Sequence, residues 1–105
     1  MHHQTAQSLH KNFIQGEQKA LDITNYFLQR IDDVDRDLSC FLTVLNERAR
    51  EKSEILDQKR KSGKKLGRLA GVPIALKDNM HIQGEITTCA SKFLTNYRAV
   101  FDATV

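Results

Sequence analysis

The residue of this sequence best placed to do chemistry is Lys77, which ends a short apolar run over residues 73–76. Asp78 and Asn79 follow it at once, and such polar residues are typical of a turn. The run begins with Pro73, which suits the first position of a strand, so a short buried strand is predicted there. On this pattern alone, the simplest interpretation of Lys77 is an edge lysine whose ammonium extends into water.

Two other charged clusters resemble ligand-binding motifs only in part. Asp33, Asp35 and Asp37 alternate as in a calcium-binding loop, but leucine and valine stand at the sixth and twelfth positions instead of glycine and glutamate. The basic run over residues 59–65 lacks the spacing and the Gly-Lys-Ser/Thr ending of a phosphate-binding loop. A solvated turn and a flexible solvated loop are the better interpretations.

Neither the histidines nor the cysteines form a pattern that binds metal. The two cysteines, Cys40 and Cys89, are too few for a disulfide framework and too far apart for a redox or zinc pair, so we expect both to be reduced. None of the four histidines has the spacing of metal ligands. We therefore expect no metal site in this chain.

Hydrophobic periodicity predicts three helices in the first 62 residues. A short helix over residues 5–14 has Leu9 and Phe13 on one face, and Gly16 follows where a helix commonly ends. A second, over residues 21–34, carries one apolar stripe but has no capping side chain before it. A third, highly charged helix runs from Asn46 to about residue 62 and has few side chains to bury, which places it on the outside.

Short strands are predicted elsewhere, over residues 40–45 and at the final residues 103–105. These strands offer little area to cover the apolar faces of the helices, and a domain this small buries only a modest share of its surface. We therefore expect further sequence or a partner to complete the core.

Composition is that of an ordinary globular protein, with 40% apolar and 28% charged residues and a net charge of +3. No apolar stretch approaches the roughly 20 residues of a membrane helix, and the amino terminus lacks a signal-peptide pattern, so we expect a cytoplasmic protein without a membrane partner. The basic excess over residues 59–68 has no interleaved aromatic residues, which argues against a nucleic-acid surface.

Residues 69–79, LAGVPIALKDN, are similar residue for residue to the segment that carries the catalytic lysine of the amidase signature family. Residues 87–91, TTCAS, and 101–105, FDATV, resemble the next two landmarks of that family at the expected distances. Within the family, the details are most similar to the branch that serves tRNA-dependent amidotransferases as their A subunit, including an upstream Gly-Glu pair and a helix that ends in RI-x-x-x-D.

The resemblance implies an α/β fold around a mixed sheet and a serine, cis-serine, lysine triad. Residues 1–62 would be a mainly helical amino-terminal segment, and residues 63–105 would be the first strands of the core, so that the chain holds one incomplete domain. Lys77 would accept a proton through the bridging serine while the second serine attacks a carboxamide. Asp78 or Asn79 would orient the ammonium or a neighbouring loop.

Both serines of that triad belong to a glycine- and serine-rich stretch that is not in this chain. Ser91 is no substitute, because TTCAS lacks the glycines that would bring backbone amides to an oxyanion. These 105 residues alone are therefore predicted to have no amidase activity.

The lysine must be neutral to act as a base. An ordinary lysine, with a pKa of ~10.4, reaches its neutral form at pH 7 only at a cost of about 4.6 kcal/mol. Burial lowers the pKa of a lysine by desolvation. We expect Ile74, Ala75 and Leu76 to supply the dry wall for Lys77.

The same resemblance implies partners and cofactors. Such a protein releases ammonia from glutamine or asparagine, and B and C subunits complete a heterotrimer that amidates glutamyl- or aspartyl-tRNA. No cofactor is expected in this chain, whereas ATP and magnesium are expected in the partner. Two alternatives stay open: a generic amidase of the same family, and a non-catalytic helical interaction module.

Overall fold

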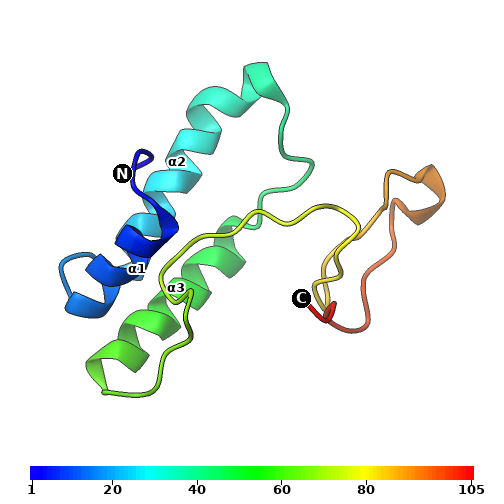
Figure 1. The fold of residues 1–105 in the computed structure, drawn as a ribbon. Helices are drawn as coiled ribbons and strands as arrows, with labels where there is room; N and C mark the ends of the chain where they lie inside the picture. The colour runs from blue at the N-terminus through cyan, green and yellow to red at the C-terminus, as the bar shows by residue number, and fades with distance from the viewer. The chain divides into compact units, whose positions relative to one another are not determined.

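A computed structural model describes all 105 residues, from Met1 to Val105. The chain packs into two compact units, Met1–Pro73 and Ile74–Val105. Three helices, coloured from blue to green in Figure 1, lie in the first unit. This division describes packing within the chain and not domains, so the predicted boundary between residues 62 and 63 stays a prediction.

The first helix, α1, spans Ala6–Gln15, as its periodicity predicts. Thr5 caps its start, because the Oγ1 atom of Thr5 accepts a hydrogen bond from the amide of Ser8 at 3.1 Å. Gly16 ends the helix in the left-handed conformation with φ of 79°, where a residue with a Cβ atom would be strained. Both ends of α1 thus follow from residues beside it in the sequence.

The second helix, α2 (Ala20–Leu38), is longer than predicted, and its missing cap comes from the third helix, α3 (Asn46–Lys61). The two oxygens of the Asp57 carboxylate accept hydrogen bonds from the amides of Ala20 and Leu21, at 2.9 and 3.1 Å. A buried carboxylate at this position also stabilises the positive end of the α2 dipole. Helix α2 therefore begins where α3 supplies a cap.

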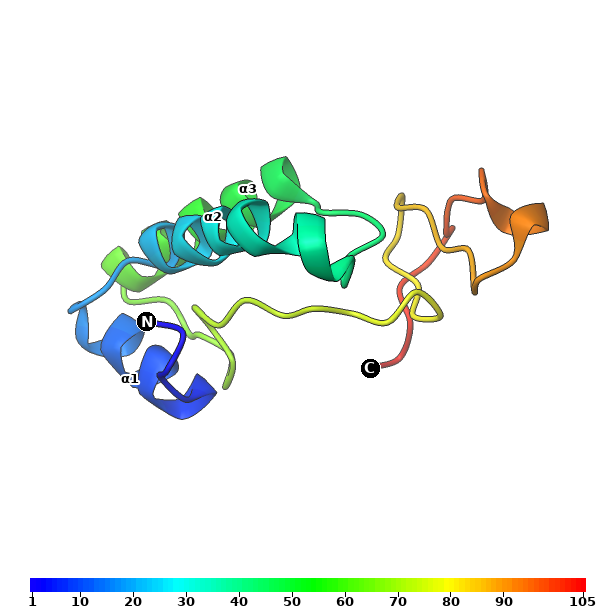
Figure 2. The same cartoon turned by 90° about the horizontal axis from the view of Figure 1, so that it is seen from above.

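Helices α2 and α3 pack side by side and antiparallel, as the two views in Figures 1 and 2 agree. Polar side chains join them: the hydroxyls of Thr24 and Ser53 lie 2.6 Å apart, and Arg50 Nε donates to Asn25 Oδ1 at 2.9 Å. Thr24 and Ser53 are both buried. The charged α3 helix therefore joins α2 through hydrogen bonds as well as through its few apolar side chains.

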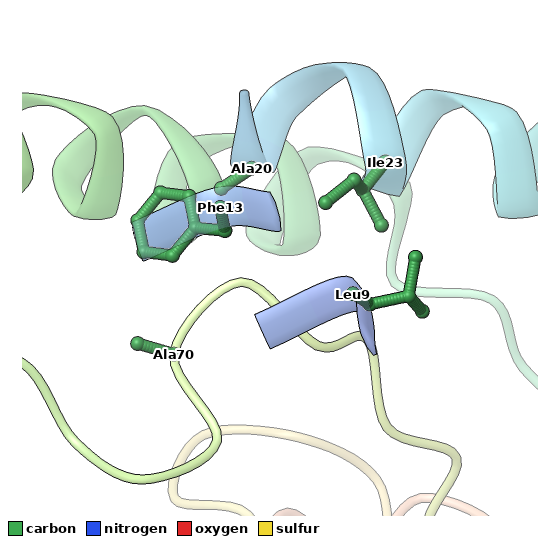
Figure 3. Close-up of a cluster of buried hydrophobic side chains, with 5 residues drawn as sticks. All are labelled: Leu9, Phe13, Ala20, Ile23 and Ala70. Atoms are coloured by element: carbon green, nitrogen blue, oxygen red, sulfur yellow. The ribbon is translucent and has the colours of Figure 1, made fainter. Parts of the chain in front are cut away.

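A small apolar core lies where α1 meets the start of α2 and the segment after α3. Figure 3 shows its buried side chains, which are Leu9, Phe13, Ala20, Ile23 and Ala70. Phe13 and Ile23 are fully buried, and Leu56, Leu66 and Val72 are among the half-buried residues packed against the cluster.

The returning segment approaches this core so closely that only glycine fits at position 71. A Cβ atom on Gly71 would lie 2.6 Å from the Cγ atom of Phe13, and the residue has a φ of 83°. Arg60 of α3 closes the other side of Phe13: its Nη1 atom donates to the carbonyl of Phe13 at 2.8 Å, and its guanidinium lies 5.0 Å from the ring centroid.

The predicted strand over residues 40–45 is wrong, because these residues are irregular and Leu42 is 78% exposed. The amides that would have paired with a neighbouring strand bind Asp35 instead: Cys40 N donates to Oδ1 at 2.7 Å and Phe41 N to Oδ2 at 3.2 Å. Ser39 takes the left-handed conformation, with φ of 53°, at the end of α2. The segment thus serves as the carboxyl cap of a helix.

The predicted strands over residues 73–76 and 103–105 are also irregular. A single antiparallel bridge, between Ile86 and Arg98, is the whole of the β-structure, because no other segments lie alongside to form a ladder. The α/β fold class is therefore correct for its amino-terminal helices, and its mixed sheet is not formed by these residues.

The second unit, Ile74–Val105, is a loop-rich hairpin closed by backbone hydrogen bonds. Gly84 N donates to Ala99 O at 2.8 Å, and Ala99 N returns a bond to Glu85 O at 3.0 Å. A short 3₁₀ helix, η1 (Lys92–Leu94), lies in the connection, and Thr87 and Ala99 are buried. These contacts hold the second unit together from within.

Candidate functional site: the Lys77 turn

Lys77 begins a tight turn in the second unit. Its carbonyl accepts a hydrogen bond from the amide of Met80 at 3.0 Å, so that Asp78 and Asn79 occupy the two central positions, as the sequence predicts. The three residues expected at the site are therefore consecutive members of one turn. Such a turn fixes the direction in which the backbone presents the lysine side chain.

The dry wall expected around Lys77 is absent from these residues. Lys77 is exposed, and so are Ile74 at 61% and Leu76 at 49%. An irregular chain buries side chains only where other elements cover it, and none in this unit covers residues 74–77. The expectation that Ile74, Ala75 and Leu76 enclose the lysine is thus wrong for this part of the protein.

Asp78 is bound to Thr88, ten residues further along the chain. Its Oδ1 atom accepts a hydrogen bond from the amide of Thr88 at 2.9 Å, and its Oδ2 atom accepts a short one from the Thr88 hydroxyl. These donors, the hydroxyl foremost, lower the pKa of Asp78 from its ordinary value of 3.8, because they stabilise the ionised carboxylate. The carbonyl of Asp78 also accepts from the amide of Cys89 at 3.0 Å.

The Thr88 segment forms a second tight turn with an unusual backbone. Cys89 and Ala90 have φ values of 49° and 60°, and the amide of Ser91 donates to the carbonyl of Thr88 at 2.8 Å. Two successive left-handed residues are normal in this kind of turn only for residues such as Asn and Gly. Each non-glycine residue in this conformation costs about 1–2 kcal/mol.

The other candidate groups play smaller parts in this geometry. Asn79 is exposed at the tip of the Lys77 turn, and Ser91 closes the second turn through its backbone amide. No three His, Cys, Asp or Glu side chains gather in a group that could hold a metal ion. No helix is long and apolar enough to cross a membrane.

The sequence alone did not identify Thr88 as the partner of Asp78. Its only signal is position, because Thr88 belongs to the TTCAS segment that resembles a family landmark. Nor did the sequence identify Asp57 as a helix cap, since 36 residues separate it from Leu21, whose amide it binds.

The sequence profile of the Amidase family matches residues 22–105, a span that includes the Lys77 turn and the Thr88 turn. This chain therefore belongs to the amidase family, as the segment around Lys77 predicts. The match begins within α2 and runs to the end of the second unit.

Similar proteins refine this class. The chain is 50% identical over 105 residues to the A subunit of the glutamyl-tRNA(Gln) amidotransferase of Chlamydia felis, and 44% identical over 101 residues to that of Fusobacterium nucleatum. It spans 100% and 96% of its own length in these matches but only 21% of each relative. The predicted likeness to the A-subunit branch is confirmed, and the chain spans about a fifth of the length of these relatives.

A solved structure has the same fold over nearly all of this chain. It belongs to work described as an unexpected vestigial protein complex that reveals the evolutionary origins of an s-triazine catabolic enzyme. The TM-score is 0.89 with 28% identity, covering 94% of this chain and 22% of the other. The arrangement of helices and turns seen here therefore occurs within a chain more than four times as long.

Proposed function

We propose that this chain is the part of a tRNA-dependent amidotransferase that carries the catalytic lysine of its A subunit. The observation that carries the proposal is the 50% identity to such a protein over all 105 residues, which covers the Lys77 turn as well as the helices. The reaction of the whole protein would be hydrolysis of the side-chain amide of glutamine or asparagine, with release of ammonia.

Lys77 would act as the base of this reaction. In its neutral form, the amine would take a proton from a bridging serine, which in turn takes one from the nucleophilic serine as that residue attacks the amide carbon. Neither serine is among residues 1–105, so these residues by themselves would not hydrolyse amides. Because Lys77 is exposed here, the desolvation that favours a neutral amine would have to come from other parts of the protein.

Partner subunits would use the ammonia. Two further subunits, B and C, would complete a heterotrimer in which charged tRNA is bound and amidated. ATP and magnesium would act in the partner that activates the tRNA-linked carboxylate, and the protein that contains this chain would need no cofactor of its own. The names of the similar proteins, each an A subunit, support this division of labour.

The test uses the native protein, meaning the protein from its own source that contains this chain, together with any subunits that copurify. Ammonia release from glutamine and asparagine is measured first, and then conversion of glutamyl-tRNA(Gln) to glutaminyl-tRNA(Gln) with ATP and magnesium. We expect ammonia release and tRNA amidation that depends on the amide donor. No release from either amino acid would contradict the proposal, and release without tRNA amidation would indicate a generic amidase.

A further inference from the structure

The residue that follows Lys77 is tied to the Thr88 turn by three hydrogen bonds. Two reach the Asp78 carboxylate from the amide and hydroxyl of Thr88, and one reaches the Asp78 carbonyl from the amide of Cys89. The side chain and the backbone of Asp78 are therefore both fixed to the same segment. We call this set of bonds the Asp78–Thr88 clamp.

The clamp also holds a strained piece of backbone. Thr88 Oγ1, while donating to Asp78, accepts a hydrogen bond from the amide of Ala90 at 3.2 Å, within the turn that places Cys89 and Ala90 in the left-handed region. Strain of this kind persists only where the surrounding contacts over-determine the conformation, and such sites are concentrated where function needs a fixed geometry. Here the over-determining contacts converge on the residue beside Lys77.

The clamp has an electrostatic consequence for Lys77. A carboxylate next to a lysine in sequence can form an ion pair with it, and an ion pair favours the charged ammonium, which cannot accept a proton. In this structure both oxygens of Asp78 are engaged by Thr88, and no ion pair joins Asp78 to Lys77. The donors of Thr88 thus hold the carboxylate away from the amine.

We propose that Asp78 and Thr88 are positioning residues for the lysine base. The clamp fixes the turn that carries Lys77, and it withholds the Asp78 carboxylate from the amine that must become neutral. This inference rests on the proposed function, in which Lys77 takes a proton from a bridging serine. It adds Thr88 to the site, a residue that would touch neither the substrate nor the reacting atoms.

Steady-state kinetics of the native protein with glutamine test the inference, using kcat per folded molecule, KM and the midpoint of thermal unfolding. Thr88→Val keeps the size of the side chain and removes the hydroxyl donor. We expect kcat to fall about 10- to 100-fold, the size of effect that a misplacement of about 1 Å produces, with KM changed by less than about threefold. Thr88→Ser restores the donor, and we expect kcat within about threefold of the wild type.

Thr95→Val is the matched control, because Thr95 is exposed in the same unit and its hydroxyl donates to the carbonyl of Lys92 at 2.7 Å. We expect its kcat to equal that of the wild type. If Thr88→Val does not fold, Asp78→Asn replaces it: one oxygen stays for the Thr88 amide, the anionic acceptor of the hydroxyl is lost, and the same fall in kcat is expected.

Three outcomes separate the possible failures. A lowered unfolding midpoint with an unchanged kcat per folded molecule, in whichever clamp variant folds, would show a purely structural contact and overturn the inference alone. A fall in kcat that Thr88→Ser does not reverse would also overturn it, because the hydroxyl would then not be the group that matters. A wild-type protein that releases no ammonia would overturn the proposed function, and the inference with it.

Discussion

Asp57 offers the sharpest test of how the first unit is held together. Helix α2 has no capping side chain of its own, and Lys19 at its N-cap position makes no side-chain hydrogen bond to it. The two amides that would be left unpaired are instead bound by the buried Asp57 carboxylate of α3. Asp57→Ala should therefore loosen α2 although the substituted residue lies on another helix.

The magnitude follows from the two bonds. Loss of a capping side chain costs up to about 2 kcal/mol, and the amide of Ala20, which lies in a buried setting, adds about 1 kcal/mol when it loses its partner. The combined cost is about 3 kcal/mol. Since about 1.4 kcal/mol is a factor of ten, the opening equilibrium of α2 should become on the order of 100-fold more favourable.

Amide hydrogen exchange of the native protein measures this equilibrium directly, using the slowest amides of α2. Glu54→Ala is the control, because Glu54 is an exposed carboxylate on the same helix, and its loss should change stability by less than about 0.5 kcal/mol. If exchange in α2 rose no more in Asp57→Ala than in Glu54→Ala, the cap would not be what starts this helix, and the reasoning would be refuted.

Two further changes have defined outcomes. Gly71→Ala should destabilise the first unit by about 3 kcal/mol in a thermal or denaturant unfolding experiment, because its Cβ would overlap the ring of Phe13 and its φ is positive, whereas Gly67→Ala, with nothing within 4 Å, should have little effect; equal effects would contradict this packing. In an NMR titration of the carboxyl carbon, Thr88→Val should raise the pKa of Asp78 toward 3.8, and an unchanged pKa would exclude the hydroxyl as the main cause.

The titration also sets the pH range of the clamp. The pKa of Asp78 in the folded state is depressed, so the stability that the clamp contributes is complete above its ordinary value of 3.8 and is lost as pH falls through the lowered value. Acidification should therefore release Thr88 from Asp78 only below the ordinary titration range of an aspartate. Near neutral pH, the clamp should not respond to pH.

The helices were predictable because their signals are local. Thr5 and Gly16 stand beside the ends of α1, and the periodicity of α2 lies within its own residues. The start of α2 was not predictable in the same way, since its cap is contributed by Asp57 through tertiary packing. The third helix was predicted within a residue at each end, but not the buried hydrogen bonds through which it joins α2.

The strands failed for a different reason. Residues 40–45 have the composition of a strand, but a strand needs a neighbour for its amides, and Asp35 takes two of them at the end of α2. The turn at Asp78 and Asn79 was correctly predicted from residue type alone. The pairing of Asp78 with Thr88 has no local signal, because it depends on the approach of two turns ten residues apart.

Ammonia release from glutamine by the native protein, with Lys77→Ala compared against Lys92→Ala, tests the central claim most directly. Lys92 is an exposed lysine of the same unit, on η1, and it has no assigned role in the site. The account predicts wild-type release for Lys92→Ala and a loss of at least about 100-fold for Lys77→Ala, since a base contributes on the order of 10²- to 10⁴-fold. Full glutaminase activity in Lys77→Ala would contradict the assignment of Lys77 as the base.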